Sequence, residues 1–179
     1  MKKIASVLGA VILALVLLAG LAVPAAAANE TWVVASTSGV NLRKSATTGS
    51  SVLGVLALGS TITVSKKAQG GGVSWGYVSS AKPAKGSWGK SSGGWVSLDP
   101  CMQGSPTKWT AQNSLNLRGK ADAKSSRLAL LPKNTTVVVT TIVKQGGYTW
   151  GRVAYAKAPN NEYWMRMGWV ALDYCKKTS

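Results

Sequence analysis

The stretch Val40-Asn41-Leu42-Arg43 returns 75 residues later as Leu115-Asn116-Leu117-Arg118. In both places apolar and polar side chains alternate, which is the period-two pattern of a strand with one buried face. A stretch that recurs at a fixed distance is typical of a repeated structural unit. The two stretches therefore indicate that the two halves of the chain are related.

The repeat extends through both halves. The other matched segments are 52–64 with 127–139, 75–78 with 150–153, and 94–101 with 168–175. The eight tryptophans fall into four pairs: Trp32 with Trp109, Trp75 with Trp150, Trp88 with Trp164, and Trp95 with Trp169. Two large copies indicate a duplicated domain, because solenoids need at least three repeats. We expect one domain at 29–101, a short linker at 102–107 and a second domain at 108–179.

Each copy is predicted to be all-β. The runs Thr61-Ile62-Thr63-Val64 and Thr136-Val137-Val138-Val139 are rich in β-branched residues, which favour strands. Glycine-rich or asparagine-rich turns separate such runs at short spacing, as in small barrels or sandwiches. Gly59 in the first copy is replaced by Asn134 in the second, and these two residue types best tolerate a positive φ. We therefore expect a tight turn with a left-handed residue at this point.

The pattern of residues 1–28 predicts a secretory signal peptide, which we expect to be helical. Lys2-Lys3 precede the apolar stretch 4–23, and Pro24 with four alanines follows it. An uncleaved anchor is the alternative, since about 20 apolar residues can span a bilayer. Cleavage would remove the two lysines and lower the formal net charge from +16 to +14. We expect a secreted protein, extracellular or associated with the cell wall, that touches membrane only through an uncleaved signal segment.

The composition excludes several classes of enzyme and of metal site. The chain has 21 lysines and arginines, 5 acidic residues and no histidine. Without histidine, Ser-His-Asp and Cys-His catalysis and imidazole-ligated metals are excluded, and no paired carboxylates stand ready for acid–base work. We therefore expect no enzyme, no cofactor and no metal. The positive surplus favours a polyanionic partner, and export argues against nucleic acid as the natural one.

The ordered set of motifs resembles the bacterial SH3 (SH3b) domain, with the N-L-R strand, the β-branched run, W-G-x-V and the final G-W-V-x-L occurring in both copies. The resemblance covers 31–101 and 108–175. It implies an all-β fold with two tandem small SH3-like β-barrels after the N-terminal signal-peptide helix. It also implies binding of cell-wall material, often beside a hydrolase. The segments 79–93 and 154–167 are longer than the hairpin usual in the family, so no family ligand contact is carried over to them.

These long loops carry the residues that we expect to bind a ligand. Loops lie at the surface and often hold binding residues. An exposed tryptophan can stack on a sugar face or an apolar peptide while neighbouring cations meet phosphate or carboxylate; the alternative is that it folds back over a small core. The candidates are Trp88, Lys82, Lys85 and Lys90 in the first copy, and Trp164, Tyr155, Lys157, Tyr163 and Arg166 in the second.

Two matched pairs of charged residues are structural candidates. Arg43 and Arg118 occupy equal positions in the two copies, and so do Asp99 and Asp173. We expect an arginine–aspartate contact that joins the first strand of each copy to its last strand. The alternative is that the aspartates orient a ligand amine.

The two cysteines end the two copies. Cys101 and Cys175 stand at equivalent positions, and in an exported chain they permit one intramolecular disulfide. Such a bond would set the orientation of one copy relative to the other. An intermolecular bridge and free thiols are the alternatives.

The sequence thus predicts a secreted, non-catalytic protein that binds the bacterial cell wall, through peptidoglycan or a teichoic-type anionic polymer. Two sites in tandem would gain avidity on a repetitive polymer. The alternative from another class is a secreted protein–protein adaptor, or a targeting module for a wall hydrolase or receptor, that uses the same loops. An extracellular binder of nucleic acid or of membrane surfaces is a further reading, which rests on charge alone.

Overall fold

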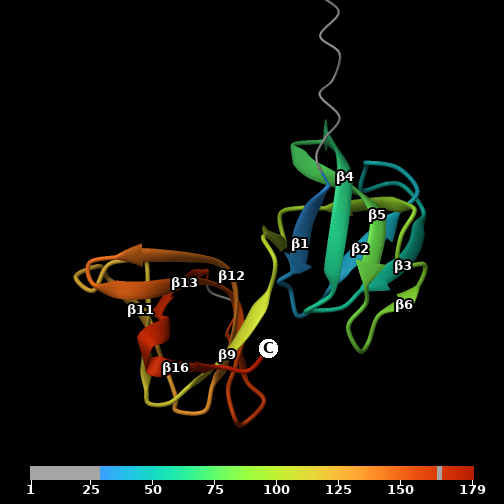
Figure 1. Ribbon diagram of the computed structural model, residues 1–179. Helices are drawn as coiled ribbons and strands as arrows, with labels where there is room; N and C mark the ends of the chain where they lie inside the picture. The colour runs from blue at the N-terminus through green and yellow to red at the C-terminus, as the bar shows by residue number, and fades with distance from the viewer. Residues whose placement is uncertain (1–28, 165–166) are drawn as a thin grey trace, which may run out of the picture.

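The structure, a computed structural model, describes residues 29–164 and 167–179 (Figure 1). The predicted signal peptide lies outside the described residues. The described chain is all-β, with two antiparallel sheets and a single short 3-10 turn, η1 (Leu172–Tyr174). The prediction of an all-β fold is therefore confirmed. Within the described residues no helix has the length and apolar character needed to cross a membrane.

The first sheet is built by residues 30–103, which we call the first unit. Its strand order is β6-β3-β2-β7-β5-β4-β1-β8. The strands are β1 (Glu30–Val34), β2 (Val40–Arg43), β3 (Val52–Leu56), β4 (Thr61–Gly70), β5 (Val73–Lys82), β6 (Trp88–Gly89), β7 (Gly94–Ser97) and β8 (Cys101–Gln103).

The second sheet is built by residues 107–177, which we call the second unit. Its strand order is β11-β10-β15-β13-β12-β9-β16, and β14 pairs with β13 beside this path. The strands are β9 (Thr107–Ala111), β10 (Leu115–Arg118), β11 (Arg127–Leu131), β12 (Thr136–Gln145), β13 (Tyr148–Lys157), β14 (Tyr163–Trp164), β15 (Gly168–Ala171) and β16 (Cys175–Lys177).

The repeated sequence produces repeated local geometry. The turn before each β-branched run has a left-handed residue, with φ of 86° at Gly59 and 65° at Asn134, so the predicted turn is confirmed. Trp75 and Trp150 are each 2% exposed. Their indole Nε1 atoms donate to Gly70 O at 3.1 Å and to Gln145 O at 3.0 Å. Both tryptophans are therefore core residues.

Each unit has its own apolar core. The side chains of Leu42, Leu56 and Val96 lie in the first, and those of Leu117, Leu131 and Val170 occupy the matching places in the second. All six side chains are fully buried. Each of these cores draws on strands of one unit only, which is what a duplicated sequence is expected to give.

The two long loops take different paths. In the first unit Trp88 pairs across β6 with Val55 on β3, whereas in the second unit Trp164 pairs across β14 with Ala156 on β13. A Cβ atom at Gly54 would meet the backbone oxygens of Trp88 and Lys90, so β6 needs a glycine under it. The repeat places an alanine, Ala129, at the matching position of β11. The Cβ atom of Ala129 therefore leaves no room for a segment to pass over β11 as closely as β6 passes over Gly54.

The expected arginine–aspartate contact is wrong. Each arginine donates from Nη1 to the serine carbonyl oxygen seven residues further on, Arg43 to Ser50 at 2.6 Å and Arg118 to Ser125 at 2.7 Å. Asp99 and Asp173 take part in no ion pair within the described ranges. Asp173 accepts instead from the backbone N–H of Thr149 at 2.8 Å. Each guanidinium group therefore holds the loop that follows its own strand, because a carbonyl oxygen of that loop lies within hydrogen-bonding distance.

The predicted disulfide is not formed, and both thiols are free. Cys101 lies in the core of the first unit and Cys175 packs against the core of the second. Their Sγ atoms face the carbonyl oxygens of Ser97 at 3.6 Å and Ala171 at 3.8 Å. The reason is that equivalent positions in two separate cores keep the sulfur atoms apart.

We expect both thiols to react slowly in the folded protein. Burial, followed by the charge of Asp99, raises the pKa of Cys101 to about 12, and burial with Asp173 raises the pKa of Cys175 to about 11. Because the thiolate is the reactive form, iodoacetamide at about pH 8 should label both at least about tenfold more slowly than in denaturant. Cys175 should react before Cys101. Intact mass without reductant checks the result, and a mass lower by two hydrogens would show a disulfide instead.

Candidate functional site

The two loop tryptophans predicted to bind a ligand differ in exposure. Trp88 is 58% exposed on β6. Trp164 is partly buried and packs against the core of the second unit, with its indole nitrogen buried and unpaired among the described residues. Trp164 therefore fits the alternative that a loop tryptophan folds back over the core. The ring of Trp88 is instead exposed to solvent. A ligand-binding role for Trp88 stays a prediction.

The other loop candidates divide into two groups. The structure brings Lys85, Tyr155, Lys157 and Tyr163 together where the two units meet. Lys82 at the end of β5 and Lys90 after β6 are exposed and line neither of those cavities. Arg166 lies outside the described residues.

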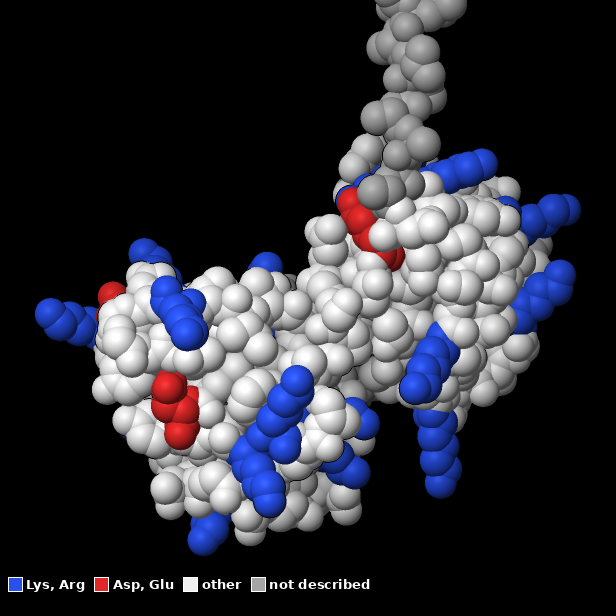
Figure 2. All heavy atoms as spheres, in the orientation of Figure 1, with Lys and Arg blue, Asp and Glu red and all other residues white. Residues whose placement is uncertain are grey.

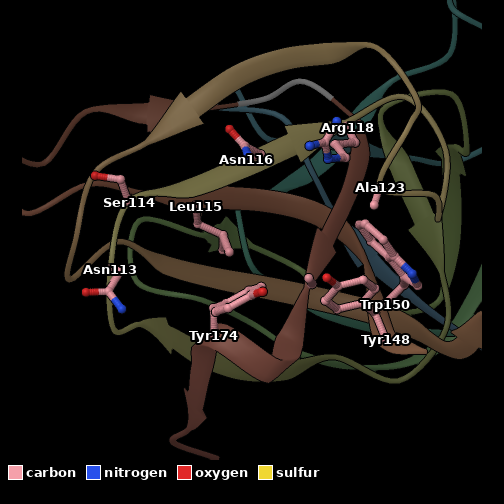
Figure 3. A pocket seen from close by; sticks show the side chains of 10 residues that line it. Asn113, Ser114, Leu115, Asn116, Arg118, Ala123, Tyr148, Trp150 and Tyr174 are labelled. Carbon is pink, nitrogen blue, oxygen red and sulfur yellow. The ribbon is translucent and has the colours of Figure 1, made fainter. Parts of the chain in front are cut away.

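A pocket in the second unit was not predicted from the sequence. It is a cavity of about 340 Å³ at one end of the sheet, and Figure 3 shows its side chains. β10 supplies Asn116 and Arg118, the start of β13 supplies Tyr148 and Trp150, and η1 supplies Tyr174. These residues come from three separate parts of the chain, which the sheet pairings bring to one place. We call this cavity the aromatic pocket.

Three rings form one wall of the aromatic pocket. The Tyr148 and Trp150 rings meet edge to face with centroids 5.8 Å apart, and the Tyr148 and Tyr174 rings are 6.3 Å apart. A side-chain hydrogen bond with Tyr148 is the largest cause that raises the pKa of Tyr174. Tyr174 is 48% exposed, so its ring is open to a ligand.

The polar side of the aromatic pocket is held in place by the local fold. Arg118 is fixed through its bond to the Ser125 carbonyl oxygen, and guanidinium groups have further donors free for carboxylate or phosphate. Asn116 adds an amide, whose Oδ1 is buried and has no partner among the described residues. No aspartate or glutamate is among the residues that line the cavity. The arrangement combines stacking surfaces with one positive charge, which suits recognition of a carboxylate-bearing sugar or peptide.

The first unit lacks the walls of this pocket. Asn41, Arg43 and Trp75 repeat Asn116, Arg118 and Trp150, but Val73 and Pro100 stand where the second unit has Tyr148 and Tyr174. Aligning the two copies could have found the site, because the tyrosines are among the positions where an otherwise repeated pattern changes. Their proximity could not have been found in this way, since it depends on η1 turning back towards the start of β13.

No family model and no curated protein matches the chain. Among solved structures, NlpC2 from Trichomonas vaginalis has 12% identity and a TM-score of 0.30, over 86% of this chain and 50% of that one. NlpC1 from the same organism has 11% identity and a TM-score of 0.30, over 84% and 46%. A Listeria monocytogenes protein described as an autolysin has 14% identity and a TM-score of 0.30, over 82% and 61%. The chain thus spans about half the length of these proteins.

Proposed function

We propose that this protein is a secreted, non-catalytic cell-wall-binding protein made of two bacterial SH3 domains, each closing its sheet into a small barrel. The first domain comprises 29–101 and the second 108–179, after a signal peptide. The ligand is wall material, either peptidoglycan or an anionic wall polymer. Binding by the second domain uses the aromatic pocket.

The observation that carries the proposal is the chemistry of the aromatic pocket. Aromatic faces bind the apolar faces of sugars and peptides, and a fixed guanidinium binds carboxylate with defined geometry. Peptidoglycan offers both kinds of group. The pocket brings no carboxylate or imidazole to a bound ligand, and these are the side chains that most often serve as general acid or base.

We expect the mature chain to sediment with purified bacterial cell walls and to remain bound after the anionic polymers are stripped from them. The physical reason is that stacking and a fixed arginine depend less on salt than long-range attraction between a basic protein and a polyanion. The measurement is the fraction of protein pelleted over a salt series, with intact and stripped walls side by side.

A protein of similar net charge and no relation to this fold serves as the control for non-specific attraction. Failure to sediment with either preparation at low salt would contradict the proposal. Saturable capture of one secreted protein, insensitive to added wall polymer, would instead support the adaptor alternative.

A further inference from the structure

We infer that the seam between the two units is a second binding site, which takes a linear phosphate-bearing polymer. The site consists of Leu58 and Lys85 from the first unit and Lys108, Tyr155, Lys157 and Tyr163 from the second. The inference goes beyond the aromatic pocket, which lies within the second unit alone. It shares with the proposed function only the expectation that wall polymers are the natural ligands.

The two units are docked through an apolar cluster. Val33 on β1 and Met102 on β8 are neighbours in the first sheet and pack against Ala154 on β13 of the second unit. These three residues are 0%, 4% and 0% exposed, with Ala35 and Tyr155 packed around them. Figure 1 shows the units side by side, joined by the short segment between β8 and β9. The seam is therefore part of the folded structure.

Two cavities lie along the seam and share two residues. One, of about 400 Å³, is lined by Lys85 and Leu58 of the first unit and by Tyr163 of the second. The other, of about 180 Å³, is lined by Leu58 together with Lys108 and Tyr163. Leu58 and Tyr163 border both cavities, so the two lie next to each other along the seam, and together we call them the groove. Each cavity has walls from both units, so the groove exists only when the units are docked.

The charge of the groove is uniformly positive. Its ionisable cations are Lys85, Lys108 and Lys157, and no acidic residue lines either cavity. Glu162, which precedes Tyr163, is engaged with the Asn160 side chain at 3.4 Å. Figure 2 shows basic side chains on both units along the lower side of the notch between them, while the acidic atoms visible in this view lie elsewhere.

The choice of lysine and tyrosine indicates the ligand class. A lysine ammonium group is a compact point charge suited to single phosphates, whereas an arginine fork prefers bidentate partners. Lys157 Nζ lies 5.6 Å from the centre of the Tyr163 ring, and the Tyr155 and Tyr163 rings are 6.4 Å apart. Point charges spaced along a partly aromatic groove suit a chain of phosphates joined by apolar or sugar linkers.

A charge-removal experiment on the full chain tests this inference. The variant Lys85→Gln/Lys108→Gln/Lys157→Gln should bind long-chain polyphosphate at least about tenfold more weakly than the unaltered protein at low salt. Each lost phosphate contact makes the negative slope of log affinity against log salt less steep by about 0.7, so the slope should become less negative by about two. The matched control Lys44→Gln/Lys133→Gln/Lys144→Gln loses the same charge from exposed positions outside the groove and should change both quantities much less.

A second variant tests whether docking makes the site. A Cβ atom at Gly59 would lie 2.8 Å from the Tyr155 hydroxyl across the seam. Asparagine accepts the positive φ of this turn, as Asn134 does in the second unit. Gly59→Asn should therefore keep the turn, displace Tyr155 and weaken polyphosphate binding several-fold. The reciprocal exchange Asn134→Gly is the control and should leave the affinity unchanged.

Three results would overturn the inference: no polyphosphate binding by the unaltered protein, equal losses in the groove and control triple variants, or equally tight binding of inorganic phosphate and the polymer. Sedimentation with stripped walls is measured in parallel for every variant. The groove variant could still sediment with stripped walls and bind polyphosphate as tightly as the unaltered protein does. That result would rule out the seam site and leave the proposed wall-binding function standing. If the unaltered protein fails to sediment with stripped walls but the groove variant binds polyphosphate more weakly, the seam site stands and the proposed wall-binding function falls.

Discussion

Replacement of Trp150 by alanine is expected to lower the free energy of unfolding of the second unit by about 3–5 kcal/mol, the usual cost of truncating a large core aromatic. The side chain is 2% exposed and packs with Ala121 and Ala171. Its indole nitrogen also donates to the Gln145 carbonyl oxygen at 3.0 Å. Since whole domains are stable by only about 5–15 kcal/mol, this loss should remove a large share of the stability of the second unit.

The measurement is thermal and urea unfolding followed by tryptophan fluorescence and near-ultraviolet circular dichroism. Trp75→Ala is the matched variant in the first unit, where the indole donates to Gly70, and it should cost a similar amount. Trp88→Ala is the control, because this ring is 58% exposed and its removal should change stability by no more than about 0.5 kcal/mol. A Trp150→Ala protein within about 1 kcal/mol of the parent would contradict the assignment of this side chain to the core.

The second large effect is expected in binding. Tyr148→Val/Tyr174→Ala removes two of the three rings of the aromatic pocket, and Val is the residue that the first unit has at the position of Tyr148. Aromatic contacts are worth about 0.5–1.5 kcal/mol each beyond their buried area, so affinity for stripped walls should fall about 5- to 150-fold. The pelleted fraction against wall concentration gives this ratio.

Two further variants keep the binding result interpretable. Tyr174→Phe retains the ring and removes the hydroxyl, so it separates stacking from hydrogen bonding. Tyr77→Val removes a ring of the first unit that packs on Trp95 with centroids 5.4 Å apart, far from the pocket in sequence and in a different sheet. Equal losses for Tyr77→Val and the double variant would point to general destabilisation and would count against the pocket as the wall-binding site.

Features that depend on neighbouring residues were predictable from the sequence. Alternation at Val40 and Leu42 marked a strand, and the Gly59/Asn134 exchange marked a left-handed turn. Both features arise within a few residues. Two expectations that joined distant residues, the arginine–aspartate contact and the disulfide, were wrong. Equal position in two copies says which residues are alike, but it does not say which residues touch.

The loops show why similar sequences can diverge in space. Trp88 and Trp164 match in the alignment, yet one lies over β3 and the other beside β13. The difference depends on the close approach that Gly54 allows and on the side chain that Ala129 has in its place. A methyl group at position 54 would meet these backbone oxygens, so the second unit, with Ala129 at the matching position, could not copy this arrangement without a shift.

By itself the sequence determined the duplication, the all-β character, the turns and the basic charge, because each of these follows from composition or from residues close along the chain. Only the tertiary structure decided that Tyr174 turns back to meet Tyr148, and that Tyr155 and Tyr163 of one unit face Leu58 of the other. The first contact is produced by sheet pairing within the second unit, and the second by the docking of Val33 and Met102 against Ala154. Such packing is settled by how whole surfaces fit, so both candidate sites emerge only once the chain is folded.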